Sequence, residues 1–195
     1  MKLPIMRLRE SWHRTQVLVV ALVLSLCLTT LSCTPEIPNR VTNEEIALYR
    51  EWLKHRFASK APEQLYLDDQ TFVFDPLEHL GCGGAMHKQD HVPWSLMKAL
   101  HSLGNSDYEV DVSPKVMQLP WSYQILNTRN FPKQSPGLHV IGFSRIAFNH
   151  SGHQGLFAFS DSCAAGLCGT GGAVLASKQR DTWQFNELKS CFWVY

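Results

Sequence analysis

The sequence predicts an α+β domain in which an N-terminal amphipathic helix packs on a C-terminal antiparallel β-meander. Apolar residues recur at helical spacing in residues 43–58, whereas the chain after Leu138 is a series of β-type segments joined by short turns. Short connections of this kind favour antiparallel neighbours. The length agrees with this class, because the 163 residues that follow residue 32 suffice for one domain with its own core.

The helix predicted over residues 43–58 begins at a capping box, Thr42-Asn43-Glu44-Glu45. In this motif the threonine hydroxyl accepts a hydrogen bond from the backbone amide of Glu45, and the Glu45 side chain reaches back to the start of the helix. The apolar stripe that follows is typical of a face turned toward a core, and it comprises Ile46, Tyr49, Leu53 and Phe57, with Trp52 beside them.

Shorter elements are predicted in the middle of the chain. Residues 65–74 have the β-branched and aromatic content of a strand, whereas residues 81–84, Gly-Cys-Gly-Gly, indicate a loop. A short helix is expected over residues 94–103, and a brief one from Ser113-Pro114. Residues 119–137 contain several prolines and are predicted to form a long irregular segment. Such a segment is either functional or contains a secondary-structure element that the pattern does not reveal.

The C-terminal meander is expected to form one sheet with an apolar face that the first helix covers. Its first two strands flank a turn that contains Gly152. The expected strands are residues 139–149, 155–163, 171–179, 182–188 and 191–195.

Residues 1–32 have the pattern of an export signal, with basic residues, an uncharged apolar run over residues 17–31, and small residues after it. Thr30-Leu31-Ser32-Cys33 resembles a bacterial lipobox, in which the cysteine becomes the lipidated first residue of the mature protein. Residues 33–41, with two prolines, are then expected to form a tether. Residues 42–195 are expected to form the single domain.

Three fates of this leader stay open, and each places the domain outside the cytoplasm. Lipidation of Cys33 would supply two or more acyl anchors, which suffice for stable attachment to the cell membrane or outer membrane. Cleavage after Ser32 without lipidation would release a soluble protein. Retention would leave an uncleaved anchor, although the apolar run is shorter than the ~20 residues of a usual span.

The charge of the mature part excludes an electrostatically driven nucleic-acid binder. Four of the 18 basic and one of the 17 acidic residues lie in residues 1–32, which leaves 14 Lys and Arg against 16 Asp and Glu. No basic patch results. No cofactor motif is present either, since the glycines of residues 169–172 lack the Gly-Lys-Ser/Thr and following helix of a phosphate loop.

Four cysteines outside the leader and the lipobox indicate disulfides in an oxidising compartment, and they allow three pairings. We expect Cys163 to pair with Cys168, because the four intervening residues can bring the two ends within bonding distance. Cys82 would then pair with Cys191 and tie the middle of the chain to its last strand. A redox-active pair is the alternative, but the short loop contains no Lys, Arg or His to lower a thiol pKa.

Residues 143–185 resemble the C-terminal signature of an uncharacterised family of exported bacterial proteins. The shared features are a Ser-Arg-hydrophobic-aromatic-Asn strand, a small-apolar strand, a Cys-Gly hairpin loop and a tryptophan near the end. LYLDDQT, residues 65–71, resembles the opening of that family, so the likeness covers about half of the mature chain. The family separates its loop cysteines by three residues, against four here. It has no established activity, so the resemblance implies export and fold and transfers no catalytic residue.

Two motifs bear on enzymatic chemistry. His87 and His91 have the spacing that places two imidazoles on one helical face as zinc ligands, with Cys82 as a third candidate. Lys88 occupies the place of the catalytic glutamate in the metalloprotease motif, so loop histidines are the preferred interpretation. Residues 150–153 and 161–162 contain Ser, His and Asp, and these could form a hydrolase triad if the two segments met across the hairpin. However, no nucleophile-elbow motif is present.

Two residues are candidates for contact with a ligand or partner. Arg145 alternates with apolar residues along a strand, so we expect a buried ion pair with Asp69 or Asp161, or a bond to a loop carbonyl. The alternative is an anionic ligand held by the planar guanidinium. Adjacent strand residues face opposite ways, so Phe192 and Trp193 cannot both point inward. One of them is expected to cover a partner surface, and Trp193 is the candidate.

These observations favour an exported, lipid-anchored, non-enzymatic domain that binds an envelope protein or a small ligand. A metal-dependent or serine hydrolase of the envelope and a passive structural protein are the alternatives. No metal, cofactor or catalytic residue is assigned from the sequence.

Overall fold

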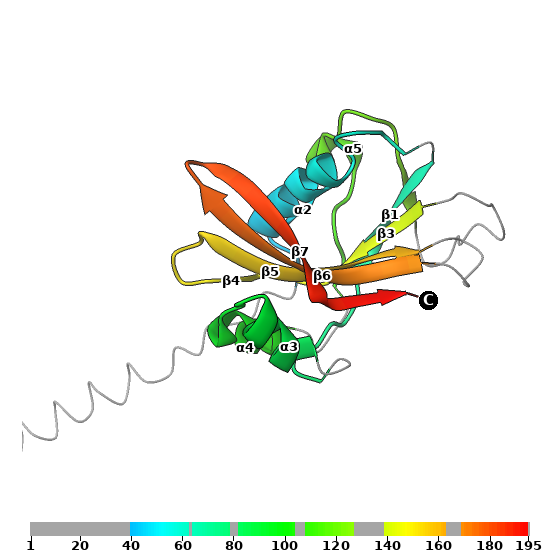
Figure 1. The fold of residues 1–195 in the computed structure, drawn as a ribbon. Coiled ribbons are helices and arrows are strands. Elements are labelled where there is room, and N and C mark those ends of the chain that lie inside the picture. The colour runs from blue at the N-terminus through cyan, green and yellow to red at the C-terminus, as the bar shows by residue number, and fades with distance from the viewer. Residues whose placement is uncertain are drawn as a thin grey trace, which may run out of the picture. The chain divides into compact units, whose positions relative to one another are not determined.

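The protein is described here by a computed structural model, whose residue ranges are 40–62, 64–78, 82–103, 108–126, 139–162 and 169–194 (Figure 1). These residues all belong to one compact unit, Pro38–Tyr195. The predicted leader, the lipidation site Cys33 and most of the tether lie outside the described residues, as do Cys163 and Cys168.

A seven-stranded sheet forms the centre of this unit, in the order β2-β1-β3-β5-β6-β7, with β4 paired to β5. The pairs from β3 to β7 are antiparallel, whereas β1 pairs in parallel with both β2 and β3. The sheet is therefore mostly antiparallel, and the predicted meander forms the larger part of it. The strands are β1 (Leu65–Thr71), β2 (Gln124–Leu126), β3 (His139–Phe143), β4 (Ala147–Phe148), β5 (Gln154–Ser162), β6 (Gly169–Gln179) and β7 (Thr182–Val194).

Helices lie on both faces of this sheet, with α2 on one face and with α3 and α4 on the other (Figure 1). None of the helices in the described ranges is both long and apolar enough to cross a membrane. Their bounds are α2 (Asn43–Arg56), α3 (Cys82–Gln89), α4 (Trp94–Leu103) and α5 (Pro114–Met117).

Helix α2 begins at the predicted capping box and packs its predicted stripe on the sheet. The Glu45 amide donates to Thr42 Oγ1 at 3.2 Å, and the Thr42 amide donates to Glu45 Oε2 at 2.8 Å. Tyr49 stacks on Phe143 with ring centroids 4.3 Å apart. The core on this side of the sheet includes Ile46, Leu48, Tyr49, Trp52, Leu53, Leu67, Ile141, Phe143, Phe157 and Phe159.

A second core fills the other face, where α3 contacts β7 and α4 contacts β4 and β5. A disulfide joins Cys82, the first residue of α3, to Cys191 of β7, with their Cα atoms 5.1 Å apart. The prediction of this pairing is confirmed. Buried members of this core include Phe74, Met86, Leu96, Met97, Leu100, Leu156, Ala158 and Leu188.

Several element predictions are wrong in detail. The strand predicted over residues 139–149 is two strands, β3 and β4, and the one predicted over residues 65–74 ends at Thr71. Residues 82–84 begin α3 instead of forming a loop, and a Cβ at Gly83 would come within 2.7 Å of the Pro76 carbonyl oxygen, so this glycine permits a close approach. Within residues 119–137 the structure bears out the second of the two alternatives, since this segment contains an unpredicted strand, β2. The last two predicted strands are one strand, β7, whose register with β6 shifts between Gly172 and Val174.

Candidate functional site

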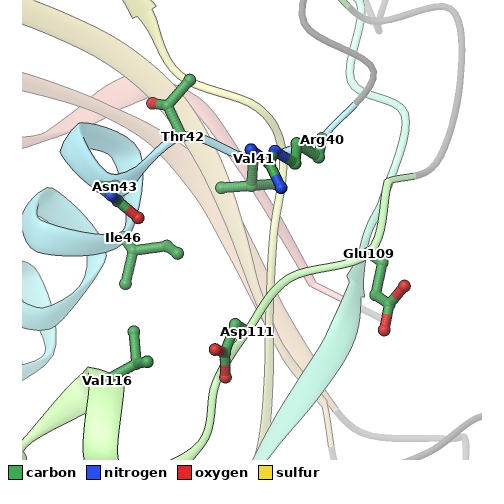
Figure 2. Close-up of a pocket in the computed structure, with 8 residues that line it drawn as sticks. All are labelled: Arg40, Val41, Thr42, Asn43, Ile46, Glu109, Asp111 and Val116. Carbon is green, nitrogen blue, oxygen red and sulfur yellow. The ribbon is translucent and has the colours of Figure 1, made fainter.

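A groove of about 720 Å³ lies beside the start of α2 (Figure 2). One wall is formed by the chain entering α2, and the other by the segment that runs from residue 109 into α5. The residues that line the groove are Arg40, Val41, Thr42, Asn43, Ile46, Glu109, Asp111 and Val116.

Local backbone bonds hold the second wall in place. The amide of Val110 donates to the carbonyl oxygen of Asp69 in β1 at 2.8 Å, and Glu109 forms an antiparallel bridge with Gln70. At Asp111 the side chain accepts a bond from the Ser113 amide at 3.0 Å, which shapes the turn into α5. This wall is therefore attached to the edge of β1 at one end and closed by a short helix at the other.

The groove combines an apolar floor with charges of both signs. Val41 and Ile46 are buried beneath it, whereas Arg40 and Asp111 are exposed at its rim. Hydrogen bonds from Ser113 hold the pKa of Asp111 below its ordinary value. Among the described residues, no ion pair involves any of the three charged groups that line the groove.

The two carboxylates of the groove do not face each other. In Figure 2 the Asp111 side chain lies on the side of its segment toward α2 and Val116, whereas Glu109 points the other way. Glycosidases require an acid and a second carboxylate on either side of one scissile bond. This arrangement favours charge recognition by Asp111 over paired acid and base chemistry.

A buried ion pair connects the two walls from beneath. Arg145 Nε and Nη2 donate to Glu45 Oε1 and Oε2 at 2.7 and 3.1 Å, and the guanidinium lies 4.6 Å from the Tyr108 ring centroid. Glu45 belongs to α2, and Tyr108 precedes the second wall. The predicted ion pair of Arg145 therefore exists, but the proposed partners Asp69 and Asp161 were wrong, because the acid comes from the capping box.

Burial places Arg145 in the core, where its side chain is 3% exposed and does not line the groove. The hydroxyl of Tyr49 donates to the carbonyl oxygen of the neighbouring Ser144 at 2.6 Å, and burial raises the pKa of this tyrosine well above its ordinary value. Arg145 thus positions the chain around the groove and does not reach a ligand in solution.

The three metal candidates do not form one site. Helix α3 ends at Gln89, and His91 has a positive φ of 56°, so the two histidines do not share a helical face. His87 Nδ1 lies 3.0 Å from the Val92 carbonyl oxygen, and Cys82 is held in its disulfide. In the part of the chain that the structure describes, no three His, Cys, Asp or Glu residues are grouped to hold a metal ion.

The hydrolase candidates are separated along the sheet. Ser151 lies in the turn before β5, whereas Asp161 and Ser162 end this strand. The ends of a nine-residue strand are about 26 Å apart at the usual rise per residue. The hydrolase arrangement, which the sequence already disfavoured, is therefore not formed, because the strand is too long for its two ends to share a site.

Trp193 is turned toward the second core. Its ring stacks on Phe74 at 5.8 Å between centroids and lies over Gly171, where a side chain would overlap it. Phe192 points the other way and is 52% exposed. Only one of the two rings faces inward, as predicted, but it is the candidate partner contact Trp193 that packs on the second core, and Phe192 is the ring left at the surface.

Two histidine–aspartate contacts were not predicted from the sequence, because each joins residues that are far apart in the chain. His139 Nδ1 lies 2.9 Å from Asp161 Oδ1, and His101 Nδ1 lies 2.7 Å from Asp75 Oδ2. Arg56 bonds both Asp161 and Glu187, which ties α2 to β5 and β7. Within the described ranges no serine hydroxyl is hydrogen-bonded to either histidine, so neither contact forms part of a catalytic triad there.

Comparisons of the chain with protein-family models, with curated proteins and with solved structures find no match. The resemblance of residues 143–185 to exported bacterial proteins therefore stays a prediction. The function of the chain has to be inferred from its own residues.

Proposed function

We propose that the chain is an exported bacterial protein, anchored through Cys33 at the cell envelope, whose domain binds a ligand without catalysing a reaction. The groove beside α2 is the proposed binding site. Its lining contains charged and amide side chains above an apolar floor, and it contains no His, Cys or Ser. The one hydroxyl group, that of Thr42, accepts the capping bond of α2.

The observation that carries the export proposal is the disulfide between Cys82 and Cys191. Disulfides persist in oxidising compartments and are rare in the cytosol. This one joins residues 109 positions apart and lies in the second core. It supports the export signal that residues 1–32 predict, because both features call for passage out of the cytoplasm.

The proposed anchor would keep the groove near the membrane. Arg40 follows Cys33 by seven residues, and seven residues span at most about 25 Å in any conformation. Arg40 itself lines the groove. The proposed site is therefore accessible to molecules in the envelope close to the membrane surface.

Expression of the full chain in a bacterium, followed by intact mass analysis of the mature protein, tests this proposal. We expect an N-terminus at Cys33 that carries acyl chains, and a domain whose Cys82 and Cys191 resist alkylation until a reductant is added. The matched Cys33→Ser variant should lose the acyl mass and keep the disulfide. A cytosolic protein with an intact leader and reduced cysteines would refute the proposal.

A further inference from the structure

We propose that the groove beside α2 binds a small zwitterionic ligand, with its ammonium group at Asp111, its acidic group at Arg40, and an apolar body between them. This inference rests on the proposed function, since it names the class of ligand for the same site.

The floor suits an aliphatic group. Val41 and Ile46 are 8% and 6% exposed, and Val116 of α5 completes the apolar surface. A volume of about 720 Å³ falls within the range of roughly 300–1,000 Å³ that is typical of small-molecule sites. The ligand is thus expected to be about the size of a short peptide and to bury an apolar portion.

The wall that contains Asp111 recognises a cation. Its carboxylate is exposed toward the groove, and Ser113, which donates the backbone bond, holds it in place. Lys115 in α5 is the basic residue whose charge acts on Asp111, but the two form no ion pair. Glu109 adds a second negative charge to the same wall. An ammonium group there gains a charge-assisted hydrogen bond.

The opposite wall recognises an anion. Arg56 and Arg145 each have carboxylate partners, whereas Arg40 has no ion-pair partner among the described residues. Figure 2 shows the Arg40 side chain running along the groove toward Val41 and the start of α2. A planar guanidinium in this place can bind a carboxylate through two parallel hydrogen bonds.

The combination of the two walls favours ligands that carry both charges. An anion without an ammonium group would bind Arg40 but lie beside Asp111, and a cation without an acidic group would lie beside Arg40. Unfavourable charge placement of this kind is a common source of specificity. A zwitterion satisfies both walls at once.

Four probes that share one apolar body test the charge requirement. These are leucyl-leucine, leucyl-leucinamide, N-acetyl-leucyl-leucine and N-acetyl-leucyl-leucinamide, which are a zwitterion, a cation, an anion and a neutral molecule. Isothermal titration calorimetry uses the full mature protein in detergent micelles at low salt. Exposed ion pairs are modest, so we expect the zwitterion to bind about tenfold more tightly than the neutral probe.

Two substitutions assign each charge to its residue. Asp111→Asn should abolish the affinity gain that a free amine gives a probe, which we expect to be about three- to fivefold. The affinity gain that a free carboxylate gives should stay the same. Arg40→Gln should do the reverse. The matched control is Asp181→Asn, whose side chain is 97% exposed in the turn between β6 and β7, and it should change nothing.

Equal binding of all four probes, absence of binding, or a preference unaffected by either groove substitution would overturn the zwitterion proposal. None of these results would affect the mass of the mature N-terminus or the oxidation state of the cysteines. Failure of the ligand class is therefore distinguishable from failure of the proposed export and anchoring.

Discussion

Glu45 joins three parts of the chain through one carboxylate. It accepts bonds from the Thr42 amide, from the Arg145 guanidinium and from the Ile146 amide, the last at 2.9 Å. Its side chain is 2% exposed, so water does not replace any of these donors. The same carboxylate thus caps α2, neutralises a buried arginine and fixes the chain that follows β3.

Glu45→Gln should destabilise the domain by about 3–5 kcal/mol, because it leaves the Arg145 charge buried without its counter-ion. The control Glu51→Gln removes one member of an exposed pair with Lys54, and it should cost less than about 1 kcal/mol. Urea unfolding of the two variants measures both values. Equal midpoints for the two would show that the buried pair adds no more than a surface pair.

The contrast between Glu45 and Arg145 shows what a sequence reveals at the residue scale. The capping role of Glu45 follows from its position three residues after Thr42, and the structure confirms it. Its role as partner of Arg145 joins residues 100 positions apart, and no local pattern encodes that contact. The burial of the arginine was predictable from alternation, whereas the identity of its acid required the fold.

Tyr123 should produce a titration step at strongly alkaline pH. Burial, with a smaller contribution from the Asp111 charge, raises the pKa of its phenol from 10.0 to about 12, and the hydroxyl donates to the Val112 carbonyl oxygen at 2.7 Å. The unfolded chain loses this proton first, so stability contributed by Tyr123 is present below pH 10 and decreases as the pH rises toward 12.

Ultraviolet absorbance of tyrosinate and thermal unfolding against pH measure this effect. Tyr123→Phe should remove the step and flatten the alkaline loss of stability. Asp111→Asn should move the step to lower pH without removing it, because it deletes only the smaller cause. An unchanged titration in Tyr123→Phe would contradict the prediction.

At the scale of elements, segments with a clear apolar pattern or a helix-start signal were predictable, and segments without either were not. Helix α2 and the strands from β3 onward follow apolar periodicity over many residues. Strand β2 has only three residues, two of them exposed, so alternation cannot indicate it. Helix α3 contains two glycines, which disfavour a helix locally, and it is held by packing and by its disulfide.

The extra residues of β7 have a structural purpose. Between paired positions, β6 has one residue, Ala173, whereas β7 has the four residues 188–191. This bulge turns Leu188 and Cys191 into the second core, where Cys191 meets α3 and the Ser190 hydroxyl donates to Asp90. It also interrupts the outer edge of the sheet, which discourages pairing with other chains.

Gly171→Ala should destabilise β6 and β7 by about 1–3 kcal/mol, because the new methyl group displaces the Trp193 ring from its place on Phe74. The control is Gly84→Ala in α3, where nothing lies within 4 Å of the new Cβ and alanine favours the helix. It should be neutral or slightly stabilising. Tryptophan fluorescence during urea unfolding compares the two, and equal stability would contradict the packing described for Trp193.

At the scale of the whole molecule, the sheet separates two cores that are stabilised by different kinds of interaction. The α2 side is held by aromatic packing and by ion pairs from Arg56 and Arg145. The α3 and α4 side carries the disulfide. The fold class was predictable because both cores produce amphipathic patterns. The groove was not predictable, because its walls come from segments about 70 residues apart and contain no ligand-binding motif.

The disulfide between Cys82 and Cys191 should contribute strongly to the stability of the domain. Closing a loop of about 110 residues removes more unfolded-state entropy than closing a short one, so we expect Cys82→Ser/Cys191→Ser to cost about 3–5 kcal/mol. The predicted bond between Cys163 and Cys168 would close a far shorter loop. Its removal by Cys163→Ser/Cys168→Ser should therefore cost only about 2 kcal/mol.

Urea unfolding of the mature protein with and without reductant measures both contributions. Reductant should lower the urea midpoint of the wild-type protein by more than that of either double variant, since each variant retains only one of the two bonds. The Cys82→Ser/Cys191→Ser variant should also lose protection of α3 and α4 amides in hydrogen exchange before it loses that of α2, because only the former helices depend on this bond for docking. A midpoint that does not respond to reductant would remove the physical basis for assigning the domain to an oxidising compartment.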